Sequence, residues 1–155
     1  MKYTFNKMSQ ESALIIANKW HYEEPYSFYD ASEDMEDYQE FISPELRNNN
    51  YYEARVNQEL VGFFSISREE NQIEIGLGLR PDLCGKGLGK DFLNQVEEYI
   101  IAIYRPSKFV IFVAAFNKRA IKVYQNCGYK IIDEENRKTN NAIYHFIHME
   151  KENIK

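Results

Sequence analysis

Gly76–Lys90 reads GLGLRPDLCGKGLGK, and this stretch decides how the rest of the chain is interpreted. The run Gln72–Leu79 that it overlaps alternates in character as a strand does, and a short turn containing Pro81 follows it. Gly87–Tyr104 then repeats apolar residues at helical spacing and stops before Pro106. A glycine-rich loop therefore connects a predicted strand to the N-terminus of the longest predicted helix.

This junction is suited to binding an anion. Backbone N–H groups at a helix N-terminus lack partners within the helix and carry the positive end of its dipole, and glycines let a ligand approach the main chain closely. Lys86 and Lys90 add positive charge, so the loop suits a diphosphate group. The alternative explanation is a tight turn whose glycines only start the helix.

Two common nucleotide-binding motifs do not match this loop. Walker A requires G-x-x-x-x-G-K-[ST], whereas the pair Gly89-Lys90 is followed by Asp91. The dinucleotide pattern G-x-G-x-x-G, when started at Gly85 and Gly87, ends on a lysine instead of a glycine. Both types of nucleotide site are therefore disfavoured.

Length and composition indicate one globular domain, 1–155. Apolar residues make up 44% and charged residues 28%, as in ordinary folded proteins, and the net charge of -5 argues against nucleic acid or a membrane surface as partner. No apolar run approaches the roughly 18 residues that span a bilayer, and Met1–Gln10 lacks the apolar stretch of a secretory signal. Cys84 and Cys127 are too few and too far apart for a disulfide framework or a zinc site. We therefore expect a cytoplasmic protein with reduced thiols.

The remaining patterns predict a mixed α/β or α+β sheet domain with flanking helices. Trp20–Asp30 is expected to be an irregular connection and Glu134–Asn141 a polar loop. Further helices are expected over Met8–Lys19, Ser32–Ile42 and Asn117–Asn126. Further strands are expected over Tyr51–Val56, Leu60–Ser67, Lys108–Phe116, Tyr129–Asp133 and Ala142–Met149.

Two motifs together resemble the GNAT superfamily of acyl-CoA N-acyltransferases. The diphosphate loop of that family has the pattern [QR]-x-x-G-x-[GA], and Cys84–Gly89 reads CGKGLG. Both glycines of the pattern match, while Cys84 replaces the usual Gln or Arg and leaves the backbone amides in place. The segment Asn117–Tyr129 is similar to the family pattern N-x-x-A-x-x-x-Y-x-x-x-G-[FY]. The conjunction is much more specific than either motif alone.

The resemblance implies a mostly antiparallel central sheet with one splayed strand pair, acetyl-CoA as co-substrate, and no metal. In such enzymes, free backbone groups of the strand before the loop hold the pantetheine arm, and Leu77 and Leu79 correspond to those positions. Asn117 resembles a residue that contacts the pantetheine, although an N-cap role is also a sufficient reason for it. The implied cofactor-binding residues are Leu77, Leu79, Cys84, Gly85, Lys86, Gly87, Leu88, Gly89, Lys90 and Asn117.

Glu74 is the candidate general base. It shares one face of its predicted strand with Gly76 and Gly78, so a carboxylate stands beside two missing side chains, where an incoming amine needs space. An amine attacks a thioester only when neutral, so its proton must pass to a base directly or through water. Tyr124 matches the general acid of the family, which protonates the departing CoA thiolate. A solvated strand glutamate and an inward helical tyrosine are the respective structural alternatives.

The resemblance places the acceptor site partly on the first two helices and the loop between them. The predicted function is transfer of the acetyl group of acetyl-CoA to a primary amine of a small molecule or protein, by direct attack in a ternary complex. A peptide N-terminus, a lysine, a polyamine and an aminoglycoside all stay open as acceptors. The acidic run Glu33–Asp37 either attracts a cationic amine or forms a solvated helix face. The expected wall residues are Trp20, Tyr22, Tyr26 and Tyr29.

Other functions and chemistries are kept as alternatives or disfavoured. A non-catalytic acyl-CoA sensor, a pure interaction module and use of another acyl donor stay open. The oligomeric state stays open as well, with a homodimer among the possibilities because dimers are common in such families. The chain contains no H-E-x-x-H and no G-x-S-x-G. His145 and His148 are three residues apart in a predicted strand and so point to opposite faces. Cys84, without an evident His partner, is interpreted as a small residue that fits the turn.

Overall fold

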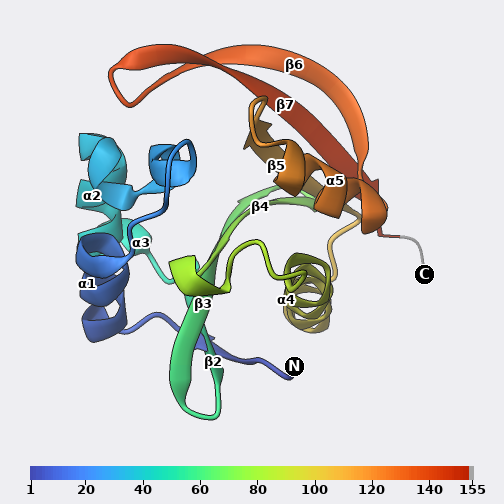
Figure 1. Cartoon of the computed structure of the whole chain (residues 1–155). Coiled ribbons are helices and arrows are strands. Elements are labelled where there is room, and N and C mark those ends of the chain that lie inside the picture. The colour runs from blue at the N-terminus through green and yellow to red at the C-terminus, as the bar shows by residue number, and fades with distance from the viewer. Residues whose placement is uncertain (154–155) are drawn as a thin grey trace.

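The computed structural model describes residues 1–153, and its centre is one seven-stranded sheet (Figure 1). Its strands are β1 (Thr4–Lys7), β2 (Tyr51–Val56), β3 (Glu59–Glu69), β4 (Gln72–Leu79), β5 (Lys108–Ala114), β6 (Lys130–Thr139) and β7 (Ala142–Glu152). They lie in the order β1-β2-β3-β4-β5-β7-β6, and every neighbouring pair is antiparallel except the parallel pair β4 and β5. The predicted mixed, mostly antiparallel sheet is confirmed.

The helices lie against opposite faces of the sheet. They are α1 (Gln10–Lys19), α2 (Met35–Ile42), α3 (Pro44–Arg47), α4 (Gly89–Tyr104) and α5 (Lys118–Asn126). Phe64 of β3 packs in the core beneath α4, while its neighbour Phe63 packs with α1 and α2, because successive strand residues point to opposite faces. Within residues 1–153, no helix is both long and apolar enough to cross a membrane.

Side chains at the helix ends account for two of the predicted helix starts. Ser9 accepts a hydrogen bond from the Ser12 N–H and begins α1, and Asn117 accepts one from the Ala120 N–H and begins α5. The second predicted helix was placed three residues too early, because Asp34 is the residue that caps α2. Both caps and the apolar periodicity of α4 support the sequence-based assignment of these elements.

The predicted polar loop over 134–141 is wrong. β6 continues to Thr139, and the turn Asn140-Asn141, with φ of 50° and 63°, leads directly into β7. β6 is an edge strand with most of its side chains exposed on both faces, so its sequence need not alternate apolar with polar residues. β1 was not predicted either, because only four residues pair with β2.

The central pair β4 and β5 separates soon after it begins. Their pairing covers only Gln72–Glu74 opposite Lys108–Val110, although β4 continues to Leu79 and β5 to Ala114. The predicted splayed strand pair is therefore confirmed, and the sheet opens at its middle. Beyond Glu74, the edges of β4 and β5 face a gap instead of each other.

Candidate active site

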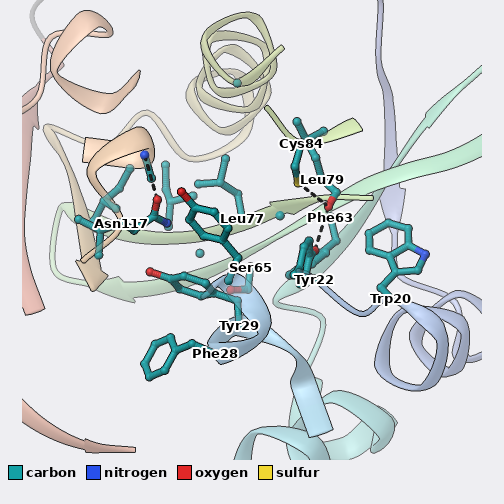
Figure 2. A pocket seen from close by; sticks show the side chains of 18 of the residues that line it. Trp20, Tyr22, Phe28, Tyr29, Phe63, Ser65, Leu77, Leu79, Cys84 and Asn117 are labelled. Atoms are coloured by element: carbon teal, nitrogen blue, oxygen red, sulfur yellow. Dashed lines mark hydrogen bonds between the residues drawn. The ribbon is translucent and has the colours of Figure 1, made fainter. Parts of the chain in front are cut away.

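A cavity of about 710 Å³ lies where β4 and β5 separate (Figure 2). This volume lies within the usual range for small-molecule and cofactor sites, about 300–1,000 Å³. Lys86 and Lys90 are exposed and do not line the cavity. The other catalytic, cofactor-binding and acceptor-wall residues expected from the sequence all line the cavity: Trp20, Tyr22, Tyr26, Tyr29, Glu74, Leu77, Leu79, Cys84, Gly85, Gly87, Leu88, Gly89, Asn117 and Tyr124.

Backbone groups of β4 point into this gap. The Arg80 N–H donates to the Val61 carbonyl at 2.8 Å, and hydrogen bonds to one neighbour alternate along an antiparallel strand. Leu77 and Leu79 therefore turn their N–H and C=O groups away from β3 and toward β5, which has already separated. The N–H and C=O of Leu77 and the N–H of Leu79 can hydrogen-bond an extended chain laid along β4, as the resemblance implied for the pantetheine arm.

Two tyrosines of the segment Trp20–Asp30, called here the acceptor segment, bond to backbone on the two sides of the gap. The Tyr22 hydroxyl donates to the Leu79 carbonyl at 2.9 Å, as Figure 2 shows. The Ala114 N–H, at the end of β5, donates to the Tyr29 hydroxyl oxygen at 3.2 Å. The acceptor segment is thus fastened directly to both strands, and the Leu79 carbonyl is already occupied.

The glycine loop, Cys84–Gly89, joins the end of β4 to α4. Gly85 and Gly87 have φ of +72° and +78°, which residues with a side chain rarely adopt. No side chain caps the first turn of α4, so its N-terminal amides are available to a ligand. Burial raises the pKa of Cys84, whose sulfur lies 3.7 Å from the Leu79 carbonyl oxygen. That thiol is held protonated, in keeping with a small residue that fits the turn.

Glu74 is half-buried and lines the cavity. Its pKa lies above the ordinary value, chiefly because burial disfavours the charged carboxylate; nearby Arg137 lowers it in part. A carboxyl of this kind exchanges its proton closer to neutral pH than an exposed one.

The two glycines that share a face with Glu74 line the same cavity, and side chains of β3 lie close to them. A Cβ on Gly78 would lie 2.7 Å from the Phe63 ring, and one on Gly76 would lie 2.9 Å from the Ser65 hydroxyl oxygen. The glycines allow side chains of β3 to lie close to the β4 backbone. The space expected beside the carboxylate is part of the cavity that Glu74 and both glycines line, and Phe63 and Ser65 limit it at the two glycine positions.

Tyr124 lies on α5 and lines the cavity. Burial raises its pKa well above the ordinary value, with the nearby Tyr29 as the next cause. The phenol therefore carries its proton throughout the neutral range and has one to donate. The Asn117 cap, whose Oδ1 accepts from the Ala120 N–H at 3.1 Å, fixes the start of the helix that carries Tyr124.

Aromatic side chains enclose the far part of the cavity. Trp20 is only 6% exposed and packs against Phe63, so it is mainly a core residue. Phe28, which the sequence analysis did not single out, lies with Tyr29 against Phe116, at ring-centroid distances of 5.5 and 6.0 Å from it respectively. The only available signal for Phe28 was its place in the same aromatic segment.

The tip of the β6–β7 hairpin, Thr139–Asn141, covers this aromatic wall. Figure 1 shows the hairpin arching from the sheet toward α2. The Asn140 N–H donates to the Asp34 carboxylate at 2.8 Å, and its side-chain amide donates to the Phe28 carbonyl at 2.9 Å. Since Thr139 and Asn140 also line the cavity, the hairpin tip forms one of its walls.

Asp34→Ala is expected to release the hairpin tip. The substitution removes the acceptor of two bonds from the tip, those of the Asn140 N–H and the Thr139 hydroxyl, together with the cap of α2. We expect faster amide hydrogen exchange over residues 138–144. Glu33→Ala, an exposed neighbour, is the control. Unchanged protection of the tip in Asp34→Ala would show that these bonds do not hold it.

Other clusters of polar side chains do not resemble a metal site. His145 contacts Glu134 and Asn136, whereas the His148 ring nitrogens lie 3.1 Å from Asp133 and 2.9 Å from Glu150. In the part of the chain that the structure describes, no three His, Cys, Asp or Glu side chains are grouped so as to hold a metal ion.

A parted β4–β5 pair, a glycine loop at the start of α4 and a deep cavity between them define the class of acyl-CoA N-acyltransferases. Residues 15–129 match the family model described as Acetyltransferase (GNAT) family. The chain belongs to this family, and it is an N-acetyltransferase that uses acetyl-CoA as co-substrate to acetylate an amine.

Individual relatives of the chain have low sequence identity to it. The chain is 27% identical over 132 residues to the acetyltransferase PseH of Campylobacter jejuni, covering 82% of each chain. It is 28% identical over 116 residues to spermidine N(1)-acetyltransferase of Vibrio cholerae, covering 74% of this chain and 65% of the relative.

Solved structures share the fold at lower identity. The aminoglycoside acetyltransferase AAC(6')-Ib in complex with coenzyme A superposes with a TM-score of 0.75 at 17% identity, covering 98% of this chain and 95% of that one. The Vibrio cholerae spermidine N-acetyltransferase in complex with CoA and spermine gives 0.74 at 16% identity, covering 96% and 94%.

Proposed function

We propose that acetyl-CoA lies in the gap between β4 and β5, with its diphosphate on the glycine loop and its pantetheine arm along Leu77 and Leu79. The observation that carries this proposal is the early separation of β4 from β5, after Glu74 and Val110. It leaves backbone N–H and C=O groups without a strand partner at the edge of a cavity that the glycine loop also lines. Asn117 would contact the arm from the start of α5.

In the proposed reaction the acceptor amine passes its proton to Glu74, directly or through water, and its nitrogen attacks the acetyl carbonyl carbon. The carbonyl electrons move onto oxygen, where the Leu79 N–H would stabilise the negative charge. The C–S bond then breaks and the carbonyl re-forms. The CoA sulfur takes a proton from Tyr124, the nitrogen gives up its second proton through water to restore the Tyr124 phenol, and Glu74 releases its proton to solvent. The products are the acetylated amine, the free thiol of CoA and one proton.

We propose a small cationic amine as the acceptor. The hairpin tip and the acceptor segment enclose the far side of the cavity, which disfavours an extended polypeptide. Asp37 lines the cavity, and burial together with neighbouring carboxylates raises its pKa to about 6. A bound ammonium group would relieve the repulsion between Asp37 and these neighbouring carboxylates. The spermidine and aminoglycoside acetyltransferases among the relatives act on amines of this kind. We further propose that the reaction takes place in the cytoplasm, as the sequence suggested.

Calorimetric titration tests the placement of acetyl-CoA. The purified protein should bind acetyl-CoA and desulfo-CoA saturably and should not bind NADH. A panel of polyamines, aminoglycosides and lysine peptides, followed by release of the CoA thiol, then tests the acceptor. Turnover with the peptides alone would contradict the small-amine proposal. Absence of CoA binding by a folded sample would contradict the acetyl-CoA site.

The pH dependence of the reaction is expected to report on Glu74. Because burial raises the pKa of Glu74 and only its deprotonated form accepts a proton, kcat/KM should increase as pH rises through that raised pKa. Glu74→Gln should remove this limb of the pH profile and lower kcat/KM by roughly tenfold at neutral pH. The loss is moderate because water can still accept the proton from the amine. Glu70→Gln, in the exposed turn after β3, is the control. An unaltered pH profile in Glu74→Gln would rule out this base.

A further inference from the structure

Arg119, on the first turn of α5, lies against the glycine loop. Its Nη1 is 3.1 Å from the position that a Cβ on Gly85 would occupy, so the guanidinium contacts the loop where it has no side chain. Arg119 also lines the cavity. The second sequence motif thus brings a cation to the first motif, although the two are separated by α4 and β5.

The guanidinium of Arg119 is available to an anion. Within residues 1–153, no carboxylate forms an ion pair with it. Arg80, which immediately precedes the turn into the loop, is by contrast tied to Glu59 at 2.7 Å and Asp82 at 2.6 Å. Of these two arginines beside the loop, only Arg119 has its positive charge uncompensated.

A ring of the acceptor segment holds the guanidinium in place. The Arg119 Cζ lies 4.2 Å from the centroid of the Tyr26 ring. Such a contact uses the attraction between a cation and an aromatic face and leaves N–H donors of the fork for a ligand. The planar fork of an arginine matches phosphate oxygens and can form two parallel hydrogen bonds with them.

We propose that Arg119 binds the diphosphate of acetyl-CoA from the α5 side, opposite the amides at the start of α4. It supplies a charged donor at a loop whose first position, Cys84, holds only a protonated thiol directed at the Leu79 carbonyl. This role rests on the proposed placement of acetyl-CoA on the glycine loop. Sequence motifs did not indicate it, because it depends on the approach of α5 to Gly85.

Calorimetric titration with CoA and with 3′-dephospho-CoA tests the assignment, because both ligands carry the diphosphate and only CoA carries the 3′-phosphate. Arg119→Gln should weaken binding of both ligands by about the same factor, about tenfold at low salt, as expected for one charge-assisted contact. The loss should shrink as salt is raised, since the side chain is exposed. Arg119→Lys, which keeps the charge without the fork, should give an intermediate affinity.

Lys122→Gln is the matched control, because it removes one exposed charge from the same helix outside the cavity. It should change neither affinity by more than about twofold. A loss confined to CoA would assign Arg119 to the 3′-phosphate and overturn the proposal. Equal affinities of wild type and Arg119→Gln would also overturn it while leaving the acetyl-CoA site intact. If the wild type bound neither ligand, the acetyl-CoA placement itself would fail, and this role with it.

Discussion

Replacing Tyr124 with Phe is expected to lower kcat by about 100-fold, the lower end of the range for loss of a general acid. The phenol is the proposed proton donor to the departing sulfur, and its raised pKa keeps it protonated at neutral pH. Thiols ionise near pH 8.5, so a thiolate leaves more readily than an alkoxide and the loss stays moderate. Acetyl-CoA affinity should be unchanged, because the ring remains. Steady-state rates and calorimetry measure the two quantities.

Tyr99→Phe is the control for that substitution. Tyr99 is a half-buried tyrosine on α4 that packs against the core outside the cavity, so loss of its hydroxyl should leave kcat within about twofold. If Tyr124→Phe retained comparable activity, its hydroxyl would have a structural role only, and another proton donor would have to serve the leaving thiolate.

Replacing Glu97 with Ala is expected to destabilise the fold by about 3 kcal/mol, the cost of breaking a buried charged pair by removing one partner. Glu97 is on α4 and only 5% exposed. It accepts a hydrogen bond from the Tyr129 hydroxyl at 2.6 Å and pairs with the Lys151 ammonium at 2.7 Å. The substitution leaves the Tyr129 hydroxyl and the Lys151 ammonium without their partner, at the contact between α4 and the C-terminal part of the sheet.

Thermal and urea unfolding measure this effect. For a chain of this size, about 3 kcal/mol corresponds to a drop in Tm of roughly 10 °C. The adjacent Glu98→Ala is the matched control, because Glu98 is exposed and its loss should shift stability by less than about 0.5 kcal/mol. Equal Tm values for the two variants would show that the buried bonds of Glu97 contribute no net stability.

The elements around the site were predictable because their sequences repeat a buried face. β4 was predicted with its observed bounds Gln72–Leu79, and α4 was predicted only two residues too early. The hairpin was harder, since most side chains of β6 are exposed and no period distinguishes such a strand from a loop. Strand pairing across a sheet is not visible in local sequence, so β1 was missed as well.

The site was predictable as far as the two motifs extended. They identify the glycine loop and the helix of Tyr124, because special backbone conformations and helix caps require particular residue types at fixed positions in the local sequence. The bonds of Tyr22 and Tyr29 to the two strands, and the approach of Arg119 to Gly85, depend on contacts between distant segments. Spacing along the chain carries no information about such contacts.

The three-residue β4–β5 pairing also bears on how firmly the molecule holds together without its substrate. Two half-sheets, β1–β4 and β5–β7, share few ladder bonds, and in the proposed placement acetyl-CoA would take the place of the missing ones. The thermal midpoint should then follow the free acetyl-CoA concentration, rising by mass action as RT ln(1 + [L]/Kd). Cellular abundance of the folded enzyme would in that way be linked to the supply of its own acetyl donor.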